Sequence, residues 1–273
     1  MRIGAIQMCS GVNIEDNIEV AGDLIRQAVK DGAQFVATPE MTHILQKNPK
    51  YLFEQITTQD EDKGVRYFSG LAAKLGIDLL IGSLAIKTGD NRAANRSLLF
   101  GPDGGVKAAY DKIHLFDVQV SKKETWKESR VYDAGRAAVI APIKGANLGL
   151  SICYDVRFAS LYRYYAQNGA DIIAVPAAFT RPTGAAHWEI LLRARAIETG
   201  CFIIAPAQGG RHADGRATWG RSMIIDPWGE ILASSPDDMT GFINADIDVE
   251  AVETIRGKIP AWNYEIGWSG DQI

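Results

Sequence analysis

The feature that most limits how this chain folds is an alternation of short apolar strands with amphipathic helices, interrupted by hairpins. Residues 2–8 predict a strand, and helical spacing over residues 14–29 follows an N-cap signal at Asn13. Residues 34–38 predict the next buried strand and residues 65–75 the second helix. This order is typical of mixed sheets with helices packed on their faces. Two sheets are expected, because this many strands would strain one twisted layer.

At 273 residues, the chain is long enough to bury a substantial core as a single domain covering residues 1–273. It has no linker, low-complexity tract or repeat. Its net charge of −4 gives no basic excess of the kind that a phosphate backbone needs, so nucleic acid is not an expected partner. Because it has neither a signal-peptide pattern nor about eighteen consecutive apolar residues, we expect a cytoplasmic protein without membrane contact.

An apolar run over residues 148–153 ends at Cys153, and a charged, aromatic segment follows at once. This order predicts a thiol at the point where a buried strand gives way to a turn or a helix. Most cysteines after such a run are small core residues, so a nucleophile needs partners elsewhere in the chain. Cys9 and Cys201 fall inside other strand patterns and are expected to be buried and inert. Three widely spaced cysteines without a CxxC pair argue against a disulfide framework or a zinc site.

Three polar residues stand where such partners are expected. Glu40 and Lys112 each follow a predicted strand, and Glu128 lies in residues 117–135, a polar segment that we interpret as an irregular surface loop. A free thiol with a pKa of about 8.5 needs a base, which a carboxylate can supply. A carbonyl under attack gains negative charge on its oxygen, which a lysine can stabilise. Taken singly, each of the three is more commonly a solvated surface residue.

Other reaction classes lack a complete signature. The four histidines form no HxH or HExxH pair, so neither a metal site nor any other cofactor is expected. The sequence has no GxSxG elbow and no P-loop, which excludes the common serine hydrolases and nucleotide-binding proteins.

Four segments occur in the order typical of one enzyme superfamily: Ala37-Thr38-Pro39-Glu40, Tyr110-Asp111-Lys112-Ile113-His114-Leu115-Phe116, Lys127-Glu128-Ser129 and Ile152-Cys153-Tyr154-Asp155-Val156-Arg157-Phe158. By these segments the chain resembles the nitrilase, or carbon–nitrogen hydrolase, superfamily over nearly its whole length. The resemblance implies an α/β fold, the four-layer α-β-β-α sandwich of the nitrilase type. It also implies a Glu-Lys-Cys triad.

The resemblance assigns a role to each residue of the motifs. Cys153 would attack the amide carbon, and Glu40 would act as general base and later activate water. Lys112 would stabilise the oxyanion together with the backbone amide of Tyr154, while Glu128 would hold Lys112 and the substrate in place. Ammonia would leave, and a thioester acyl-enzyme would be hydrolysed.

Within the superfamily, residues 179–189 and 192–198 are similar to the segment that follows the cysteine in deaminated glutathione amidases. This similarity implies a small, linear, carboxylated amide as substrate. Omega-amidases acting on 2-oxo acid amides are the near alternative, nitrilases proper are another, and a non-catalytic scaffold protein would keep the fold without activity. The candidate substrate-binding residues are Arg157, Phe179, Thr180 and Arg181, because an arginine fork suits a carboxylate.

Two departures from the superfamily pattern put the fit of the substrate in doubt. Ala159-Ser160 stands where proline and an acid are common. Trp219 and Arg221 stand where tyrosine and histidine are usual.

Two further features bear on assembly. Residues 185–199 predict a helix with an apolar face made of Ile190, Leu191, Ala194 and Ile197. The tail, residues 259–273, has little periodicity but carries three large aromatic side chains, which suits docking on a partner chain. We therefore expect a homodimer or a larger homo-oligomer.

Overall fold

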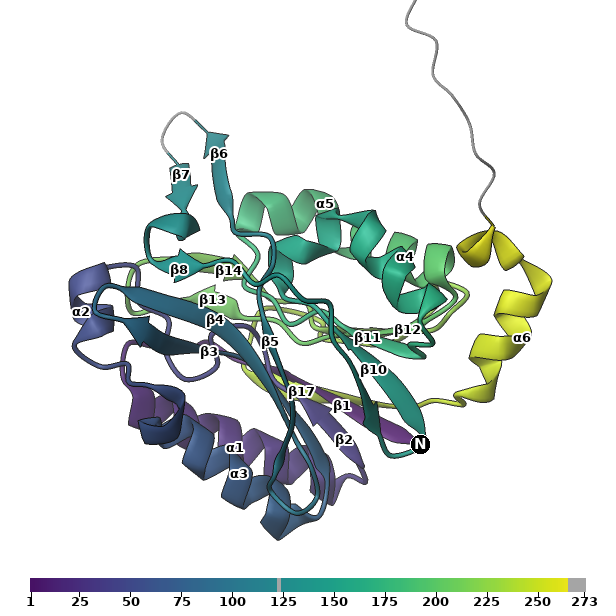
Figure 1. Ribbon diagram of the computed structural model, residues 1–273, viewed down its shortest axis with the longest axis horizontal. Coiled ribbons are helices and arrows are strands. Elements are labelled where there is room, and N and C mark those ends of the chain that lie inside the picture. The colour runs from purple at the N-terminus through teal and green to yellow at the C-terminus, as the bar shows by residue number, and fades with distance from the viewer. Residues whose placement is uncertain (122–123, 265–273) are drawn as a thin grey trace, which may run out of the picture.

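The computed structural model describes residues 1–121 and 124–264, and Figure 1 shows two sheets lying face to face. The first sheet has seven strands in the order β17-β1-β2-β3-β4-β5, with β8 beside β4. Its strands are β1 (Arg2–Gln7), β2 (Phe35–Ala37), β3 (Asp78–Gly89), β4 (Arg92–Phe100), β5 (Val106–Asp111), β8 (Tyr132–Asp133) and β17 (Gly241–Asp246).

The second sheet has six strands in the order β16-β15-β12-β11-β10-β9. Its central strands β10, β11 and β12 run parallel, as do β1, β2 and β3 in the first sheet. The strands of the second sheet are β9 (Ile140–Ile143), β10 (Ala146–Leu150), β11 (Ile172–Ala174), β12 (Phe202–Ala205), β15 (Met223–Ile225) and β16 (Ile231–Ser234).

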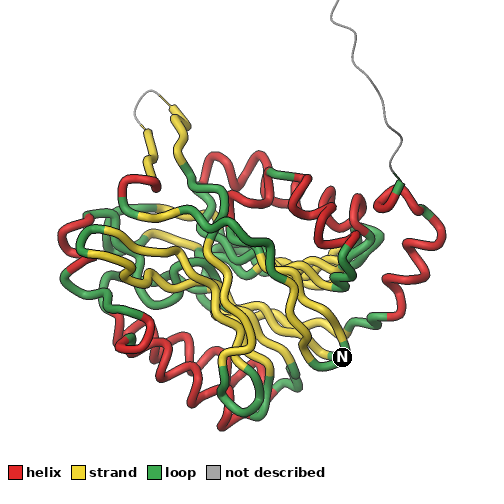
Figure 2. The backbone as a smooth tube through the Cα atoms, in the orientation of Figure 1, coloured by secondary structure: helices red, strands yellow, loops and turns green. Residues whose placement is uncertain are grey.

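Helices cover the outer face of each sheet, as Figure 2 shows by the red layers on either side of the yellow strands. The first sheet carries α1 (Ile14–Lys30) and α3 (Lys63–Leu75), and the second carries α4 (Ala159–Gln167) and α5 (Arg181–Thr199). The predicted four-layer α-β-β-α sandwich is confirmed. The remaining helical elements are α2 (Pro49–Phe53), η1 (Gln59–Glu61), η2 (Glu128–Arg130), η3 (Cys153–Arg157), α6 (Glu250–Lys258) and η4 (Pro260–Asn263).

Side chains that point alternately to the two faces of the central strands explain why the first sheet has an apolar core on each face. Ala37 and Leu80 belong to the apolar core between the two sheets, whereas their neighbours Val36 and Leu79 belong to the core under α1 and α3. Because successive side chains of a strand point to opposite faces, a strand buried on both faces reads as a continuous apolar run. The predicted N-cap is also confirmed, since Asn13 Oδ1 accepts from the Asp16 backbone N–H at 3.2 Å.

The segment 117–135 is not the irregular loop that its polar sequence predicts. It forms a hairpin of β6 (Asp117–Ser121) and β7 (Glu124–Lys127), followed by η2 and β8. The hairpin projects from the body of the molecule in Figure 1. The alternation of polar and apolar residues in Asp117-Val118-Gln119-Val120-Ser121 is a strand signal, and it predicts this structure better than the overall polarity of the segment does.

Helix α5 begins four residues earlier than predicted and presents a different face to the core. Ile190 and Ile197 of the predicted apolar face are 70% and 55% exposed, whereas Trp188 and Leu192 are buried. The helix carries apolar residues on more than one side, so packing against the second sheet decides which side is covered.

Two smaller expectations change, and one more hairpin is present. Strand β10 ends at Leu150, so Cys153 lies in η3 rather than in the strand. Cys9 is exposed, not buried, while Cys201 is buried as expected. A second small hairpin, β13 (Gly209–Arg211) with β14 (Ala217–Trp219), follows β12 in the chain.

The first part of the C-terminal tail contacts its own chain. The Arg163 guanidinium donates to Tyr264 O at 2.7 Å, and Arg256 lies 4.8 Å from the ring centre of Trp262. The rest of the predicted docking segment, residues 265–273, lies outside the described residues, so docking on a partner stays a prediction. Among the described residues, no helix combines the length and the apolar character needed to cross a membrane.

Candidate active site

Four side chains that the motifs predict come together at one end of the sandwich. Glu40 lies just past β2 and Lys112 just past β5, both in the first sheet. Cys153 opens η3 after β10 of the second sheet, and Glu128 opens η2 after β7. All four line one cavity of about 690 Å³. The site therefore lies where strand ends from both sheets meet, as is common in α/β folds.

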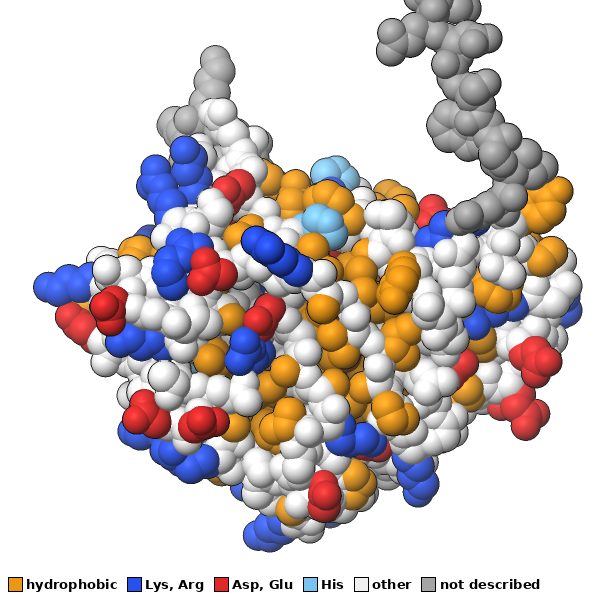
Figure 3. All heavy atoms as spheres, in the orientation of Figure 1, with side chains coloured by type: hydrophobic (Ala, Val, Ile, Leu, Met, Phe, Trp, Pro, Cys, Tyr) orange, Lys and Arg blue, Asp and Glu red, His pale blue; other side chains and the backbone are white. Residues whose placement is uncertain are grey.

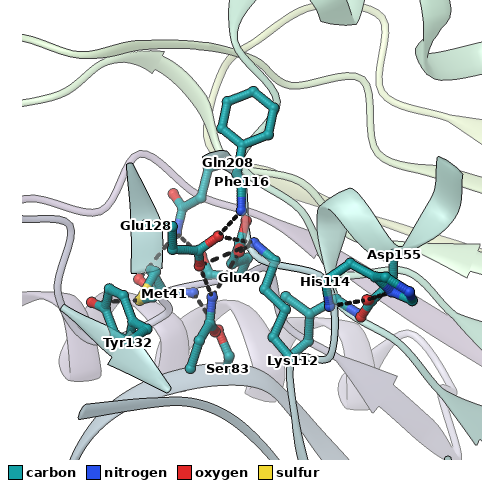
Figure 4. Close-up of polar contacts among 12 residues, drawn as sticks. Glu40, Met41, Ser83, Lys112, His114, Phe116, Glu128, Tyr132, Asp155 and Gln208 are labelled. Atoms are coloured by element: carbon teal, nitrogen blue, oxygen red, sulfur yellow. Dashed lines mark hydrogen bonds and ion pairs between the residues drawn. The ribbon is translucent and has the colours of Figure 1, made fainter. Parts of the chain in front are cut away.

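Lys112 lies between the two carboxylates (Figure 4). Its Nζ donates to Glu40 Oε1 at 2.8 Å and to Glu128 Oε1 and Oε2 at 3.1 and 2.9 Å. The side chain is only 2% exposed. Burial alone lowers the pKa of Lys112, but the charges of Glu128 and Glu40 outweigh it and hold this pKa well above its usual value. Lys112 is therefore a fixed cation in the wall of the cavity.

Asn95, in the interior of β4, binds the same two carboxylates. Its Nδ2 donates to Glu40 Oε1 at 2.9 Å and to Glu128 Oε1 at 3.1 Å, and its backbone carbonyl accepts from Lys112 N at 3.0 Å. The residue is fully buried. No motif in the sequence singles out Asn95. The available signal is an amide within a central strand, where a buried polar group has to find partners.

Cys153 is held in a strained conformation. Its backbone φ is 50°, in the left-handed region that residues other than glycine rarely adopt. Its N–H donates to Pro176 O at 2.8 Å, which ties η3 to the end of β11. Burial and the charge of Glu40 raise the pKa of the Cys153 thiol well above its usual value, although Lys112 acts in the opposite direction. The resting thiol therefore keeps its proton and needs a base when it attacks.

The segment that carries Glu40 is fixed on both sides. Gln208 Nε2 donates to Glu40 O at 3.0 Å, and the next residue, Met41, has a positive φ of 55°. A side chain at Gly82 of β3 would lie only 2.0 Å from Thr38 O, so glycine is required where these two backbones approach. These contacts set the direction of the Glu40 side chain.

Asp155 joins the cysteine segment to the lysine segment. Its Oδ2 accepts from Tyr110 OH at 2.6 Å and from Ile152 N at 2.8 Å. Its Oδ1 accepts from His114 N at 2.9 Å and lies 2.7 Å from His114 Nδ1, a contact drawn in Figure 4. Asp155 is fully buried, so all of its oxygen contacts are within the protein. This carboxylate fixes the distance between the two halves of the site.

The residues predicted to bind substrate divide into two pairs. Phe179 and Thr180 line the cavity, as does Tyr154 next to the cysteine. Arg157 and Arg181 are not among the described residues that line it. Arg157 instead lies over the rings of Tyr154 and Phe179, and Arg181 pairs with Asp238.

An arginine that the motifs do not single out lines the cavity instead. Arg216 precedes β14, and its Nε donates to Asp214 Oδ2 at 2.6 Å. The signal in the sequence is the Asp214-Gly215 pair, which is typical of a tight turn between two strands. Recognising that turn would have placed Arg216 at the end of a hairpin.

The four residues that depart from the superfamily pattern do not line this cavity. Ala159 and Ser160 are exposed in the first turn of α4. Trp219 and Arg221 line a smaller hollow of about 500 Å³ beside α5. Among the described residues, none of the four lines the larger cavity.

Solved structures with the same fold include proteins of related sequence. The NitFhit protein of Caenorhabditis elegans matches with a TM-score of 0.90 and 34% identity, over 97% of this chain and 64% of that longer chain. The chain thus spans less than two thirds of NitFhit. Nit3 of Saccharomyces cerevisiae, a member of the nitrilase superfamily, matches with a TM-score of 0.85 and 25% identity, over 95% of this chain and 94% of that chain.

Sequence comparison agrees with the fold. A deaminated glutathione amidase of Synechocystis sp. is 40% identical over 268 residues, which is 96% of this chain and 97% of the relative. That of Yersinia enterocolitica is 38% identical over 267 residues, covering 96% of this chain and 92% of the relative. The model of the carbon–nitrogen hydrolase family matches residues 2–257. The chain therefore belongs to the carbon–nitrogen hydrolase family.

Proposed function

We propose that the protein is an amidase that hydrolyses a small, linear, carboxylated amide through a thioester on Cys153. One observation carries the proposal: a buried thiol shares a cavity with a lysine held between two carboxylates, of which Glu40 is buried and Glu128 partly buried. The thiol keeps its proton at rest because burial and the charge of Glu40 raise its pKa. Nucleophile, base and cation thus all line one cavity.

In the first half of the reaction, Glu40 takes the thiol proton as Cys153 Sγ forms a bond to the amide carbon. The carbonyl oxygen becomes negative and is stabilised by the Lys112 ammonium and by the Tyr154 backbone N–H. Glu40 then returns its proton to the amide nitrogen, the C–N bond breaks, and an amine or ammonia leaves. The acyl group remains on sulfur as a thioester.

In the second half, water replaces the amine. Glu40 removes a proton from water, and the oxygen attacks the thioester carbon. The C–S bond breaks, the acid product leaves, and the proton returns to Cys153. Glu128 keeps Lys112 in place throughout by its hydrogen bonds from the ammonium, and it also accepts from Phe116 N at 2.6 Å.

The relatives support deaminated glutathione as the substrate. This compound is a linear amide with carboxylates at both ends, which agrees with the class expected from the sequence. It contains no primary amide, so its leaving group is the amine of a dipeptide. Ammonia would leave only from a primary amide, such as the 2-oxo acid amides of the near alternative.

A comparison of substrates tests the proposal. Wild type is incubated with deaminated glutathione and, separately, with 2-oxoglutaramate, and both released 2-oxoglutarate and the amine are measured. We expect turnover of deaminated glutathione, no turnover with Cys153→Ala, and full turnover with Cys9→Ser, since that thiol lies outside the cavity lining. A brief incubation should add one acyl group to the intact mass of wild type.

Each alternative has its own outcome. Faster turnover of 2-oxoglutaramate with release of ammonia would assign the protein to the omega-amidases. Activity on a simple nitrile but not on the matching amide would indicate a nitrilase. Absence of turnover and of any covalent adduct would favour a non-catalytic scaffold, and turnover retained by Cys153→Ala would refute the thioester mechanism.

A further inference from the structure

The charge of the cavity is unlike that of the whole chain. The chain has a net charge of −4, yet the cavity lining includes five basic side chains and two acidic ones. The basic residues are Lys47, Lys112, Lys127, Arg130 and Arg216, and the acidic ones are Glu40 and Glu128. Both carboxylates are already paired with Lys112. Figure 3 shows that Lys and Arg side chains also gather on the surface around the base of the β6–β7 hairpin.

Of the four basic side chains apart from Lys112, Arg216 is the one that the protein orients. Its side chain is 22% exposed, while Lys47, Lys127 and Arg130 are exposed residues at the rim. Its guanidinium carbon lies 5.9 Å from the ring centre of Trp126, within the range of a cation–π contact. A side chain fixed in this way loses less entropy when it binds a ligand than a free surface lysine does.

One edge of the Arg216 guanidinium is already occupied. Its Nε donates to Asp214 Oδ2 at 2.6 Å, and its backbone N–H donates to Asp214 Oδ1 at 2.9 Å. The Asp214 side chain is only 1% exposed, so it acts as a buried support. Nη1 and Nη2 make no hydrogen bond within residues 1–121 and 124–264. These two nitrogens form the free fork of a guanidinium that lines the cavity.

The hairpin that carries Arg216 is attached to the core. His212 Nδ1 lies 2.9 Å from Ser10 O, and His212 Nε2 lies 2.6 Å from Thr218 Oγ1. Thr218 of β14 also forms a β-bridge with Thr180 at the start of α5. The position of Arg216 is therefore set before a substrate enters, as a specific binding group requires.

We propose that Arg216 anchors a carboxylate of the substrate and so selects amides that carry one. A planar guanidinium with two free donors matches the two oxygens of a carboxylate, which it binds by a bidentate pair of hydrogen bonds. The inference rests on the proposed amidase function and adds the group that recognises the charge of the substrate. It makes Arg216, rather than Arg157 or Arg181, the specificity residue of the cavity.

Kinetics with a charged and a neutral substrate test this anchor. The neutral substrate is the same amide with its carboxylates converted to methyl esters. Arg216→Gln should lower kcat/KM for the carboxylated amide by about 10- to 100-fold, chiefly through KM, because it removes a charged hydrogen-bonding partner. The same variant should leave the ester nearly unchanged, and Arg216→Lys should recover part of the lost activity. Arg211→Gln, on the same hairpin but outside the cavity lining, is the matched control and should behave as wild type.

A second measurement does not depend on turnover. Cys153 is alkylated with neutral iodoacetamide in the presence of 2-oxoglutarate, which resembles the acyl product, or of alanylglycine, which resembles the amine product without a thiol. We expect one of the two to protect the thiol in wild type and in Arg211→Gln, and to protect it at least tenfold less well in Arg216→Gln. The protecting compound tells which end of the substrate carries the anchored carboxylate.

The outcomes separate the anchor from the amidase function. Equal losses on the charged and the neutral substrate would assign Arg216 a structural role only and overturn the anchor. Protection that is absent in wild type, or equal in Arg216→Gln, would also overturn it. If wild type hydrolyses no amide but the carboxylate protects Cys153 through Arg216, the proposed function fails while the anchor stands.

Discussion

Replacement of Asp155 by asparagine tests how the two halves of the site are joined. The carboxylate accepts hydrogen bonds from Tyr110 OH, Ile152 N and His114 N, and it contacts His114 Nδ1. An asparagine has nearly the same shape but replaces one acceptor oxygen by a donor. The change therefore removes the charge and one acceptor without creating a cavity.

The magnitude follows from these contacts. If the new amide nitrogen takes the place of Oδ2, the Tyr110 hydroxyl can turn and accept a hydrogen bond from it. The buried Ile152 N–H then has no acceptor, which costs about 1–3 kcal/mol. The two bonds from His114 remain but lose the charged acceptor, at about 1 kcal/mol each. The sum is about 4 kcal/mol of unfolding free energy, a large part of the roughly 5–15 kcal/mol typical of a folded domain.

Urea unfolding followed by fluorescence measures this loss, and Tyr110→Phe is the matched control. The phenylalanine removes one hydrogen bond to a charged group, so it should cost about 1.5–3 kcal/mol, clearly less than Asp155→Asn. We also expect Asp155→Asn to lower kcat more than Tyr110→Phe does, because it weakens the contacts with His114 and Ile152 as well as the one with Tyr110. A stability loss below about 1 kcal/mol for Asp155→Asn would refute the energetic reasoning. An unchanged kcat in a folded Asp155→Asn variant would refute the positioning role.

Two further predictions concern pH and assembly. Burial lowers the pKa of His212 below its usual value, so the unfolded chain binds this proton more readily than the native protein does. The contribution of neutral His212 to the unfolding free energy is complete above about pH 6.5 and is lost as the pH falls through the pKa of the folded state. In urea unfolding, the stability advantage of wild type over His212→Gln should therefore shrink from pH 7.5 to pH 5.5. We also propose a homodimer or larger assembly, since Ile190 and Ile197 leave an apolar face of α5 exposed. Light scattering should give a multiple of the chain mass, and the double change Ile190→Glu and Ile197→Glu should reduce that mass; a monomer for wild type would remove the idea.

The central site could be predicted because its residues stand at strand ends. Lys112 directly follows β5, while Glu40 follows β2 and Cys153 follows β10 after two residues each. The carboxyl ends of parallel strands meet at one edge of a sheet, so position in the sequence carries over to position in space. The resemblance to a family then supplied the chemistry that connects the three residues.

Asn95 and Arg216 could not be found in this way, for two different reasons. Asn95 lies in the interior of β4, and its partners Glu40 and Glu128 are 55 and 33 residues away in the chain. Only the pairing of the strands makes them neighbours. Arg216 stands in a short hairpin whose strands have three residues each, too few to show a period.

The buried face of α5 shows a third limit. Periodicity tells which residues share a side of a helix, but it does not tell which of two apolar sides meets the core. Leu192 and Trp188 are covered because they meet the second sheet, whereas Ile190 lies on the opposite side. This choice is made by tertiary packing and is absent from the local pattern.

The packing between the two sheets should affect the rate of the reaction more than the packing in other parts of the core does. The base and the cation are attached to the first sheet and the nucleophile to the second, so the packing between the sheets sets their separation. Leu79 and Leu80 are adjacent in β3 and equally buried, but Leu79 contributes to the core under α1 and α3 and Leu80 to the core between the sheets.

Leu79→Ala and Leu80→Ala are therefore matched variants that differ in the face they disturb. Each should cost about 2–5 kcal/mol of unfolding free energy, because each removes the same buried side chain. Only Leu80→Ala allows the sheets to shift relative to each other, and a shift of about 1 Å at the reacting groups can cost about 100-fold in rate. We expect kcat/KM, measured well below the unfolding transition, to fall for Leu80→Ala and to stay near wild type for Leu79→Ala. Equal activity losses at equal stability would mean that the separation of base and nucleophile is set locally, by Asp155 and Pro176, and not by the packing of the two sheets.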